Sequence, residues 1–495
     1  MKMAQISSAF NGRLLVTCSI TALSQINLGL EQTAFTSAQT MPAFAHAFGA
    51  YSVEGDTHRL GSDFMDLLNG LPYVGLVFGL LQGSLISRRF GRRASLFVMC
   101  LWAFFGVSLL VTAHSQLQIL FGRMITYISM GVELAVVPVL HAELVPAQVR
   151  GFVVGTYHTG LLVGQLVMSL ICRATRETEG NFSWRVPLGL LYVIPGIVFC
   201  LGWLIPESPR LLLINARPEK ARQSLQKLRQ ARFTDDEIEQ EFGQLCDTID
   251  ITTDEGNFRE IFRGSHMQRT LITIGANIFM QVTGDSFVSQ YGRAFVRTVD
   301  AVNPFSMTCI YSAINIFVSL VAMALSDTVG RVPLLFASAV IQAGSLFTLG
   351  GLGTTDASPA VSSATMGMVA VFGVGYQIGW GPLSHVVAAE VSTTRLRDVT
   401  YAVGAIFSIL IQCAISLSVP RAVDEQTGPG SQVGFLFGIF AICAALFSWF
   451  CVPECKGKSL EEMDHLFLHG MPIREFARVG EVNVHLSKEV EKDGV

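Results

Sequence analysis

The sequence predicts an all-α membrane protein with twelve transmembrane helices in two pseudo-symmetric six-helix bundles. The first observation is that the 495-residue chain is 51% hydrophobic and only 15% charged, whereas soluble proteins carry about a quarter charged residues. The second is a set of apolar segments long enough to cross roughly 30 Å of hydrocarbon, which takes about 20 residues each. The third is a polar insert that divides these segments into two groups of six.

The apolar segments of the first group lie at roughly 14–38, 63–86, 94–113, 117–141, 152–172 and 186–205. Those of the second group lie at roughly 268–292, 305–326, 332–353, 364–390, 399–420 and 432–452. We therefore expect an N-terminal bundle (1–205), a cytoplasmic linker with short amphipathic helices (206–267), a C-terminal bundle (268–452) and a cytoplasmic tail (453–495).

The distribution of Lys and Arg predicts the orientation in the membrane. Basic residues gather in the N-terminus, the linker, the tail and the loops on their side, as the positive-inside rule expects for the cytoplasm. The other side has seven arginines: Arg59, Arg173, Arg176, Arg185, Arg293, Arg297 and Arg421. Both termini are therefore predicted to be cytoplasmic. The near-balanced net charge of −4 argues against nucleic acid as a partner.

Three short patterns occur once in each half, at corresponding places. RRFGRR (88–93) follows the second segment, and DTVGR (327–331) follows the eighth. Glu143 precedes Arg150 by the same interval as Glu390 precedes Arg397. The halves end on PESPR (206–210) and PECKG (453–457). Such matched pairs indicate an internal duplication of the kind found in transporters.

These patterns resemble the sugar porter family of the major facilitator superfamily, especially its fungal members. The resemblance covers roughly residues 12–467, and its other motifs are Gly122-Arg123, Gly164-Gln165, Trp184-Arg185-Val186-Pro187, Gly381-Pro382 and Leu460-Glu461-Glu462-Met463-Asp464. It implies the major facilitator fold and transport of a sugar or sugar-like solute by alternating access. It also implies residence in the plasma membrane.

The resemblance implies that charged residues at the helix ends form a cytoplasmic latch. In the family these groups pair across the cytoplasmic surface and hold the halves together while the carrier faces outward. The corresponding residues here are Arg92, Arg93, Glu143, Arg150, Glu207 and Arg210 in the first half, and Asp327, Arg331, Glu390, Arg397 and Glu454 in the second. Ser87 stands where the family usually has an acid, which weakens the first-half latch. The alternative is that these charges only enforce topology.

Glu31 and Arg123 are the predicted proton-coupling pair. Counted from the outer helix ends at 1.5 Å per residue, both lie about 10 Å below the outer surface. Charge within a membrane is costly and marks function by default. By resemblance, protonation of the acid at the Glu31 position releases the arginine and couples proton entry to solute binding. A structural ion pair in a facilitator is the alternative. Glu133 and Asp285 are two further intramembrane acids, which face the central cavity or bond to nearby hydroxyls and amides.

The predicted substrate site departs from the family pattern. The resemblance assigns it to His158, Gln165, Gln281, Ser286, Asn315, His385 and Ser408. A sugar needs amides for its hydroxyls and an aromatic face for its ring. Here His158 replaces a usual Gln, Met280 the first of two paired Gln residues, Ser286 an Asn, and His385 a Trp. Each missing partner costs about 1 to 3 kcal/mol, which argues against an ordinary high-affinity hexose site.

The sequence therefore predicts a monomeric carrier for a sugar-like small molecule, with the lipid bilayer as its surroundings and a proton as the coupling ion. We expect no cofactor and no metal, and no nucleophile or phosphate loop indicates an enzyme. The alternative is a related carrier or exporter for a glycoside, a polyol, or an acidic or aromatic secondary metabolite. A non-transporting sugar sensor is a third reading, disfavoured by the short tail.

Overall fold

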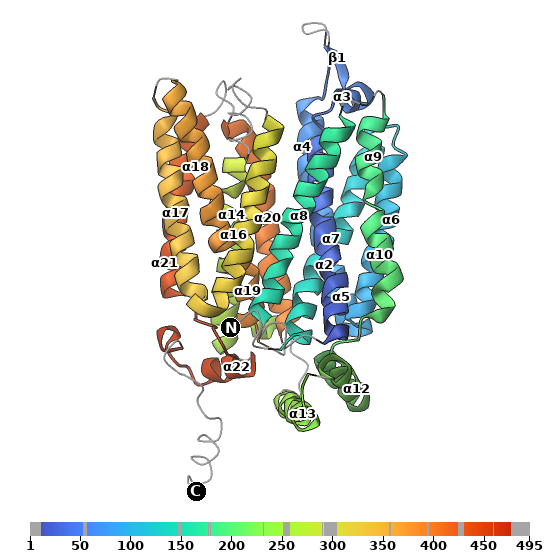
Figure 1. Ribbon diagram of the computed structural model, residues 1–495, viewed down its shortest axis with the longest axis vertical. Coiled ribbons are helices and arrows are strands. Elements are labelled where there is room, and N and C mark those ends of the chain that lie inside the picture. Colours follow the sequence, from blue (N-terminus) through green and yellow to red (C-terminus); the bar gives the residue numbers. More distant parts are fainter. Residues whose placement is uncertain are drawn as a thin grey trace.

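A computed structural model shows two helical bundles standing side by side (Figure 1). It describes residues 11–52, 57–146, 150–176, 178, 180–230, 232–250, 258–289, 291, 304–355, 358–393, 396–423, 430–458 and 460–476. The N-terminal half occupies one bundle and the C-terminal half the other, with their long helices roughly parallel (Figure 1).

The helices of the N-terminal half begin where the chain provides caps. Asn11 accepts a hydrogen bond from Leu14 N at the start of the first helix, Ser115 accepts one from Gln118 N, and Pro72 opens another helix. The elements are α2 (Gly12–Ala38), α4 (Ser62–Gly70), α5 (Pro72–Phe90), α6 (Arg92–Val111), α7 (Gln116–Leu144), α8 (Arg150–Thr175), α9 (Phe182–Leu190), α10 (Val193–Leu201) and η2 (Gly202–Leu204).

The C-terminal half repeats this arrangement. Its elements are η3 (Phe258–Phe262), α14 (Gly264–Val282), α16 (Pro304–Val329), α17 (Arg331–Leu352), α18 (Pro359–Ile378), α19 (Trp380–Val391), α20 (Arg397–Val423), η4 (Gly430–Gln432) and α21 (Val433–Phe450). The chain bends between α18 and α19 at Gly379, where the backbone N–H of Trp380 donates to Ser338 Oγ instead of continuing the helical pattern. The predicted continuous segment 364–390 is thus two helices in one span.

Among the described residues, eleven helical stretches are long and apolar enough to cross a membrane. The remaining segment of the twelve predicted ones corresponds to α14, which packs along α19 and α20. The sequence of α14 is more polar than those of the other spans, since it contains Arg269, Thr270, Thr273 and Asn277. All four are buried inside the bundle and do not face its outer surface. The chain turns after this helix at Gly284, whose φ is +100°.

Each end of the molecule carries smaller elements (Figure 1). We call the end with the antiparallel strands β1 (Ala50–Ser52) and β2 (Thr57–Arg59) and the helix α3 (Pro42–Phe48) the hairpin side; Tyr51 pairs with His58 there. We call the opposite end the linker side. It carries α11 (Pro209–Ile214), α12 (Pro218–Arg229), α13 (Asp235–Asp250), α22 (Leu460–Leu468) and η5 (Ile473–Glu475).

The linker helices are fastened to the N-terminal half. Asn11 Nδ2 donates to the carbonyls of Lys227 (3.0 Å) and Gln230 (3.1 Å) at the end of α12. Arg229 donates to Leu144 O (2.9 Å) at the end of α7 and pairs with Glu241 of α13. At the start of α13, Thr234 N donates to Glu237, and this bond lowers the pKa of the Glu237 carboxyl.

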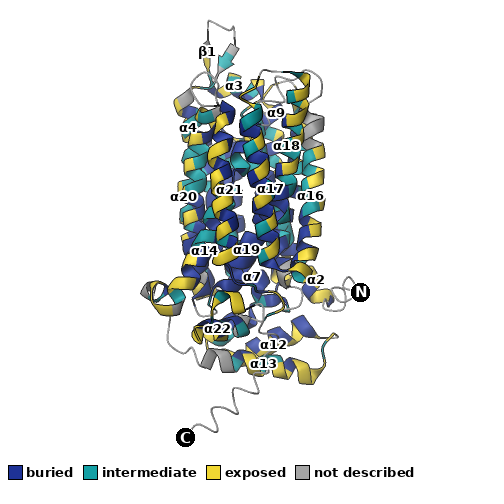
Figure 2. Cartoon of the chain, turned by 90° about the vertical axis from the view of Figure 1, so that its left-hand side faces the viewer, coloured by how far each residue is buried: buried dark blue, intermediate teal, exposed yellow. Residues whose placement is uncertain are grey.

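The outer surface of the bundles is apolar. Val74, Phe78, Leu81 and Leu85 of α5 follow one another at helical spacing and are all exposed, and exposed residues run along the outer sides of the long helices in Figure 2. A continuous apolar surface of this extent is unusual in water and is what lipid requires. Buried apolar side chains form two large clusters, one mainly in each half, and each includes a few residues of the other half, such as Ala405 in the first and Val154 in the second.

Candidate functional site

The first-half latch residues converge on Arg92 at the linker-side start of α6. Its guanidinium forms two bonds to Glu143, at 2.8 and 3.2 Å, and a third to the Ser87 hydroxyl. Glu207 accepts the backbone N–H groups of Arg92 (2.8 Å) and Arg93 (3.3 Å). The carboxylate of Glu207 thus occupies the N-terminus of α6, where the helix dipole favours an anion.

The second half repeats this site at Arg331, the start of α17. Its guanidinium bonds twice to Glu390, at 2.9 and 3.1 Å, and Glu454 accepts the N–H groups of Arg331 (2.9 Å) and Val332 (3.1 Å). Asp327, three residues before Gly330, pairs with Arg331 at 3.0 Å. The residue three before Gly91 is Arg88, and Ser87 corresponds to Ser326. The prediction that Ser87 replaces the family's acid is therefore wrong by one position: Arg88 stands there, and the first-half site lacks this carboxylate.

The remaining latch residues take different positions. The guanidinium of Arg93 stacks over Trp203 at 4.6 Å, and Arg210 is buried in α11. Arg397, from the C-terminal half, interacts electrostatically with Glu143 of the N-terminal half. The side chain of Arg150 lies outside the described part of the structure. The ion pairs at Arg92 and Arg331 lie within the halves, and the electrostatic interaction of Glu143 with Arg397 acts between them.

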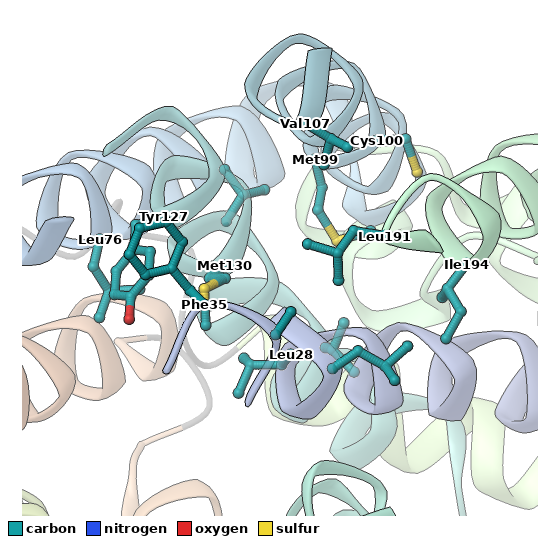
Figure 3. Packing of buried hydrophobic residues seen from close by; sticks show 14 of the residues in the cluster. Leu28, Phe35, Leu76, Met99, Cys100, Val107, Tyr127, Met130, Leu191 and Ile194 are labelled. Carbon is teal, nitrogen blue, oxygen red and sulfur yellow. The ribbon is translucent and has the colours of Figure 1, made fainter. Parts of the chain in front are cut away.

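Glu31 and Arg123 share a narrow recess inside the N-terminal half. Its other lining residues include Phe35, Thr126 and Tyr127. The guanidinium of Arg123 lies 3.9 Å from the Phe35 ring centroid and donates a long bond of 3.5 Å to Tyr127 Oη. Figure 3 shows Phe35 and Tyr127 close together in this packing.

The two charged groups of the recess are incompletely satisfied. Glu31 lies within electrostatic range of Arg123, and the neighbouring Thr126 hydroxyl donates to Arg123 O at 2.9 Å. Among the described residues, Glu31 Oε1 and Arg123 Nε and Nη1 have no hydrogen-bond partner, although both residues are buried. The sequence prediction that they lie at one depth agrees with this arrangement, in which the arginine mainly contacts aromatic faces.

Two of the predicted substrate-site residues meet where the halves touch. His158 Nε2 of α8 lies 2.8 Å from Gln377 Oε1 of α18, so the imidazole carries its proton on Nε2 and donates. His385 of α19 lies 3.3 Å from Tyr401 Oη through Nδ1, and its ring packs at 5.1 Å against Tyr157 of α8. Both histidines are buried.

The other predicted substrate-site residues are half-buried or buried and form local pairs. Gln281 Nε2 donates to Ser408 Oγ at 3.0 Å, joining α14 to α20. Gln165 Nε2 donates to Gln32 Oε1 at 3.2 Å within the N-terminal half. Asn315 lies against Gly373 of α18, and Ser286 is half-buried beyond the turn at Gly284. The structure brings His158 and His385 to the contact between the halves and leaves Gln165 on the N-terminal side.

The halves touch along their whole length. Thr159 and Ser319 hydroxyls lie 2.9 Å apart near the centre, and Asp66 pairs with Arg421 on the hairpin side. A cluster of Val139, Ala388 and Tyr401 closes the linker side.

A family model described as "Sugar (and other) transporter" matches residues 17–467. The chain belongs to the sugar transporter family of the major facilitator superfamily. It is therefore a multi-pass membrane carrier rather than an enzyme. This confirms the family and the fold class that the sequence predicts.

Curated relatives of this family member differ in what they are named for. High glucose sensor RGT2 of Saccharomyces cerevisiae is 29% identical over 80% of this chain and 53% of its own length, so the chain spans about half of that relative. Major facilitator-type transporter ecdD of Aspergillus rugulosus is 26% identical over 90% of this chain and 86% of its own. High-affinity glucose transporter ght2 of Schizosaccharomyces pombe is 26% identical over 88% and 84%.

Solved structures share the fold of this sugar transporter family member. The proton:xylose symporter XylE bound to 6-bromo-6-deoxy-D-glucose matches with a TM-score of 0.81 and 22% identity, covering 92% of this chain and 99% of XylE. An inward open conformation of XylE from E. coli matches with a TM-score of 0.67 and 21% identity, over 92% and 99%.

Sequence reasoning missed the partners of several polar residues. Gln377 bonds to His158, and Gln25 and Thr21 bond to His141 in the core of the N-terminal half. The available signal was an amide or an imidazole within an apolar segment, as with Gln25, Gln377 and His141.

Proposed function

We propose that this protein carries a sugar-like solute across the plasma membrane by alternating access, coupled to proton entry. Its linker side and both termini then face the cytoplasm. The observation that carries the coupling is the recess holding Glu31 and Arg123. A buried arginine without a close carboxylate partner is costly, so its position depends on the charge of the neighbouring acid. Protonation of Glu31 removes that charge and changes where Arg123 is held.

The duplicated latch supports alternation between two states. Arg92 and Arg331 are each held by buried carboxylates at the linker side, and Arg397 approaches Glu143 across the halves. Opening the linker side separates Arg397 from Glu143 while each half keeps its own ion pair. The halves then move as rigid bodies and exchange a small set of contacts.

Uptake by a Glu31→Gln variant tests the coupling. Cells without their own sugar carriers would express the chain and receive hexoses, disaccharides, polyols and aromatic acids at outside pH 5 and 7. We expect accumulation of one solute class that rises at acidic pH and is lost in Glu31→Gln. Glu239→Gln, on the exposed surface of α13, is the matched control and should transport normally. Equal, pH-independent equilibration by all three proteins would refute the coupling.

A carrier for a non-hexose solute is the second candidate, favoured by the contact between His158 and Gln377. That bond places an imidazole where the resemblance calls for an amide, so it offers one donor where a sugar needs a donor and an acceptor. A His158→Gln variant separates the two candidates. Under the hexose reading it gains hexose uptake, and under the second candidate it loses the polyol, glycoside or aromatic acid taken up by the native chain. Surface-localised protein without any uptake or export would favour a sensor.

A further inference from the structure

A row of buried polar side chains extends from Glu31 toward the linker side, between α2 and α7. Glu133 lies on α7 ten residues after Arg123, or about 15 Å deeper. Its residue is 2% exposed, and its Oε1 has no hydrogen-bond partner among the described residues. The Ser24 hydroxyl of α2, which donates to Thr21 O at 2.8 Å, lies close enough to act on the Glu133 carboxyl.

The groups that face Glu133 come from each element packed on this part of α7. Glu31 of α2 interacts with it electrostatically, as do Cys100 of α6 and Tyr157 of α8. On the α5 side, Gly79 and Gly83 bring only backbone against α7. On the α19 and α20 side, His385 and Tyr401 lie behind Tyr157. Within the described part of the chain, no basic side chain acts on the Glu133 carboxyl.

This environment is unsuited to a permanent structural charge. A carboxylate buried without a cation or a full set of donors is unfavourable, and two acids that sense each other hold one negative charge more easily than two. A proton on one of the pair therefore favours ionisation of the other. Glu31 and Glu133 together behave as a two-site unit for one exchangeable proton.

We propose that Glu133 is a second proton-binding site, which takes the proton from Glu31 and releases it toward the linker side. The proposal rests on the proposed function for its direction. In the transfer, the O–H bond of the Glu31 carboxylic acid breaks and an O–H bond forms on the Glu133 carboxylate, through water where the carboxyls do not touch. Glu31 becomes the anion and regains Arg123, and Glu133 is left neutral.

The proton then has two polar exits. Tyr157 lies within electrostatic range of Glu133, and its ring packs 5.1 Å from that of His385 at the contact between the halves, which opens when the linker side opens. Further along α7, His141 Nε2 lies 2.6 Å from Thr21 Oγ1, and its Nδ1 lies 3.3 Å from Gln25 Nε2. Because Gln25 Oε1 has no partner within the described residues, rotation of this amide lets His141 accept a second proton.

Infrared spectroscopy of the purified full chain in phosphatidylcholine vesicles tests proton binding without any solute. Spectra would be recorded while the pH is stepped, for the native chain, Glu133→Gln, Glu31→Gln and the surface control Glu239→Gln. We expect a titrating carboxylic acid C=O band that is absent in Glu133→Gln and unchanged in Glu239→Gln. In Glu31→Gln this band should remain with a shifted midpoint, because the coupling between the acids is gone.

A Glu133→Gln spectrum identical to that of the native chain would overturn the proposal. If Glu133→Gln does not fold, Ser24→Ala decides instead: loss of the hydroxyl should move the frequency of the same band, and an unmoved band overturns the assignment.

Transport separates this inference from the proposed function. For a solute that the native chain accumulates, Glu133→Gln should exchange the solute at the native rate. Its solute-driven proton uptake should be at least tenfold lower than that of the native chain. Native proton uptake retained in full by Glu133→Gln overturns this inference alone. A native chain that moves solute without protons overturns the proposed function and the transfer step with it.

Discussion

The duplicated latch offers a comparison between two nearly identical sites within one chain. Glu143 and Glu390 each hold a buried arginine by two bonds, and the side chains of Arg92 and Arg331 are only 4% and 3% exposed. The sites differ in one carboxylate, since Asp327 also pairs with Arg331, whereas Arg88 stands at the corresponding position of the first half and Arg92 bonds to the Ser87 hydroxyl. We predict that Glu143→Gln favours local opening of its own site, at the start of α6, more than Glu390→Gln favours local opening at the start of α17; this is distinct from separation of the two halves.

The magnitude follows from burial. Removing one partner of a buried ion pair costs about 3 to 5 kcal/mol, which corresponds to roughly 100- to 4000-fold in an opening equilibrium. After Glu390→Gln, Asp327 still faces Arg331 at 3.0 Å, with its side chain 24% exposed. A partly exposed pair contributes about 1 kcal/mol. The loss at Glu390 is therefore smaller than that at Glu143, by roughly fivefold in the opening equilibrium.

A buried thiol reports the opening of the second latch. Cys455 follows Glu454 and is buried beside Arg331 and Glu390, and burial raises the pKa of its thiol. It reacts with a maleimide only when the site opens. Ser208 has the same place after Glu207, so Ser208→Cys supplies the probe for the first latch. Labelling of each cysteine would be followed by mass spectrometry, with the variants compared within that background.

Adding Arg88→Asp to Glu143→Gln should recover about the fivefold difference, because Arg88 lies three residues before Gly91 as Asp327 lies three before Gly330. Glu239→Gln should leave both labelling rates unchanged. Equal acceleration at the two sites, together with no recovery by Arg88→Asp, would show that the third carboxylate contributes nothing.

Two further predictions concern conformation and the linker. Gly91 and Gly330 have φ values of +105° and +112°, and a Cβ at either would overlap the carboxylate of Glu207 or Glu454, respectively. Either Gly→Ala change should therefore destabilise the protein by at least the ~1–3 kcal/mol of backbone strain, measured as a lower melting temperature by fluorescence-detected chromatography. The control Gly243→Ala, at a position with open space around it, should leave the melting temperature unchanged. Asn11→Ala removes a helix cap worth about 1 kcal/mol and both hydrogen bonds to α12. Amide hydrogen exchange near Lys227 and Gln230 should therefore accelerate about fivefold. Unchanged exchange rates would show that α12 is held by other contacts.

Local patterns predicted most of the fold. Apolar runs of membrane length locate the spans because only helices satisfy their backbone groups in lipid. The repeated motifs pointed to the clusters at Arg92 and Arg331, where equivalent sequence produced equivalent geometry, but their ion pairs lie within the halves and the missing acid stands at Arg88 rather than Ser87. The bend at Gly379 was not predicted, because it depends on a hydrogen bond from Trp380 to Ser338, on another helix.

The polar contacts between distant helices were out of reach of the sequence. His158 and Gln377 are 219 positions apart, and Gln25 and His141 are 116 apart. Whether a buried histidine meets an amide, an acid or a solute depends on helix rotation and on the approach of the two halves. A single sequence contains the residue types but no measure of these distances.

The attachment of α12 and α13 has a consequence for dissecting the protein. Through Asn11 and Arg229, these helices are bonded to the first and last turns of helices in the N-terminal half. A chain severed after Asp250 would keep both of them with residues 1–250. The two pieces, produced from separate transcripts, should then reassemble in one membrane through the contacts between the two halves alone.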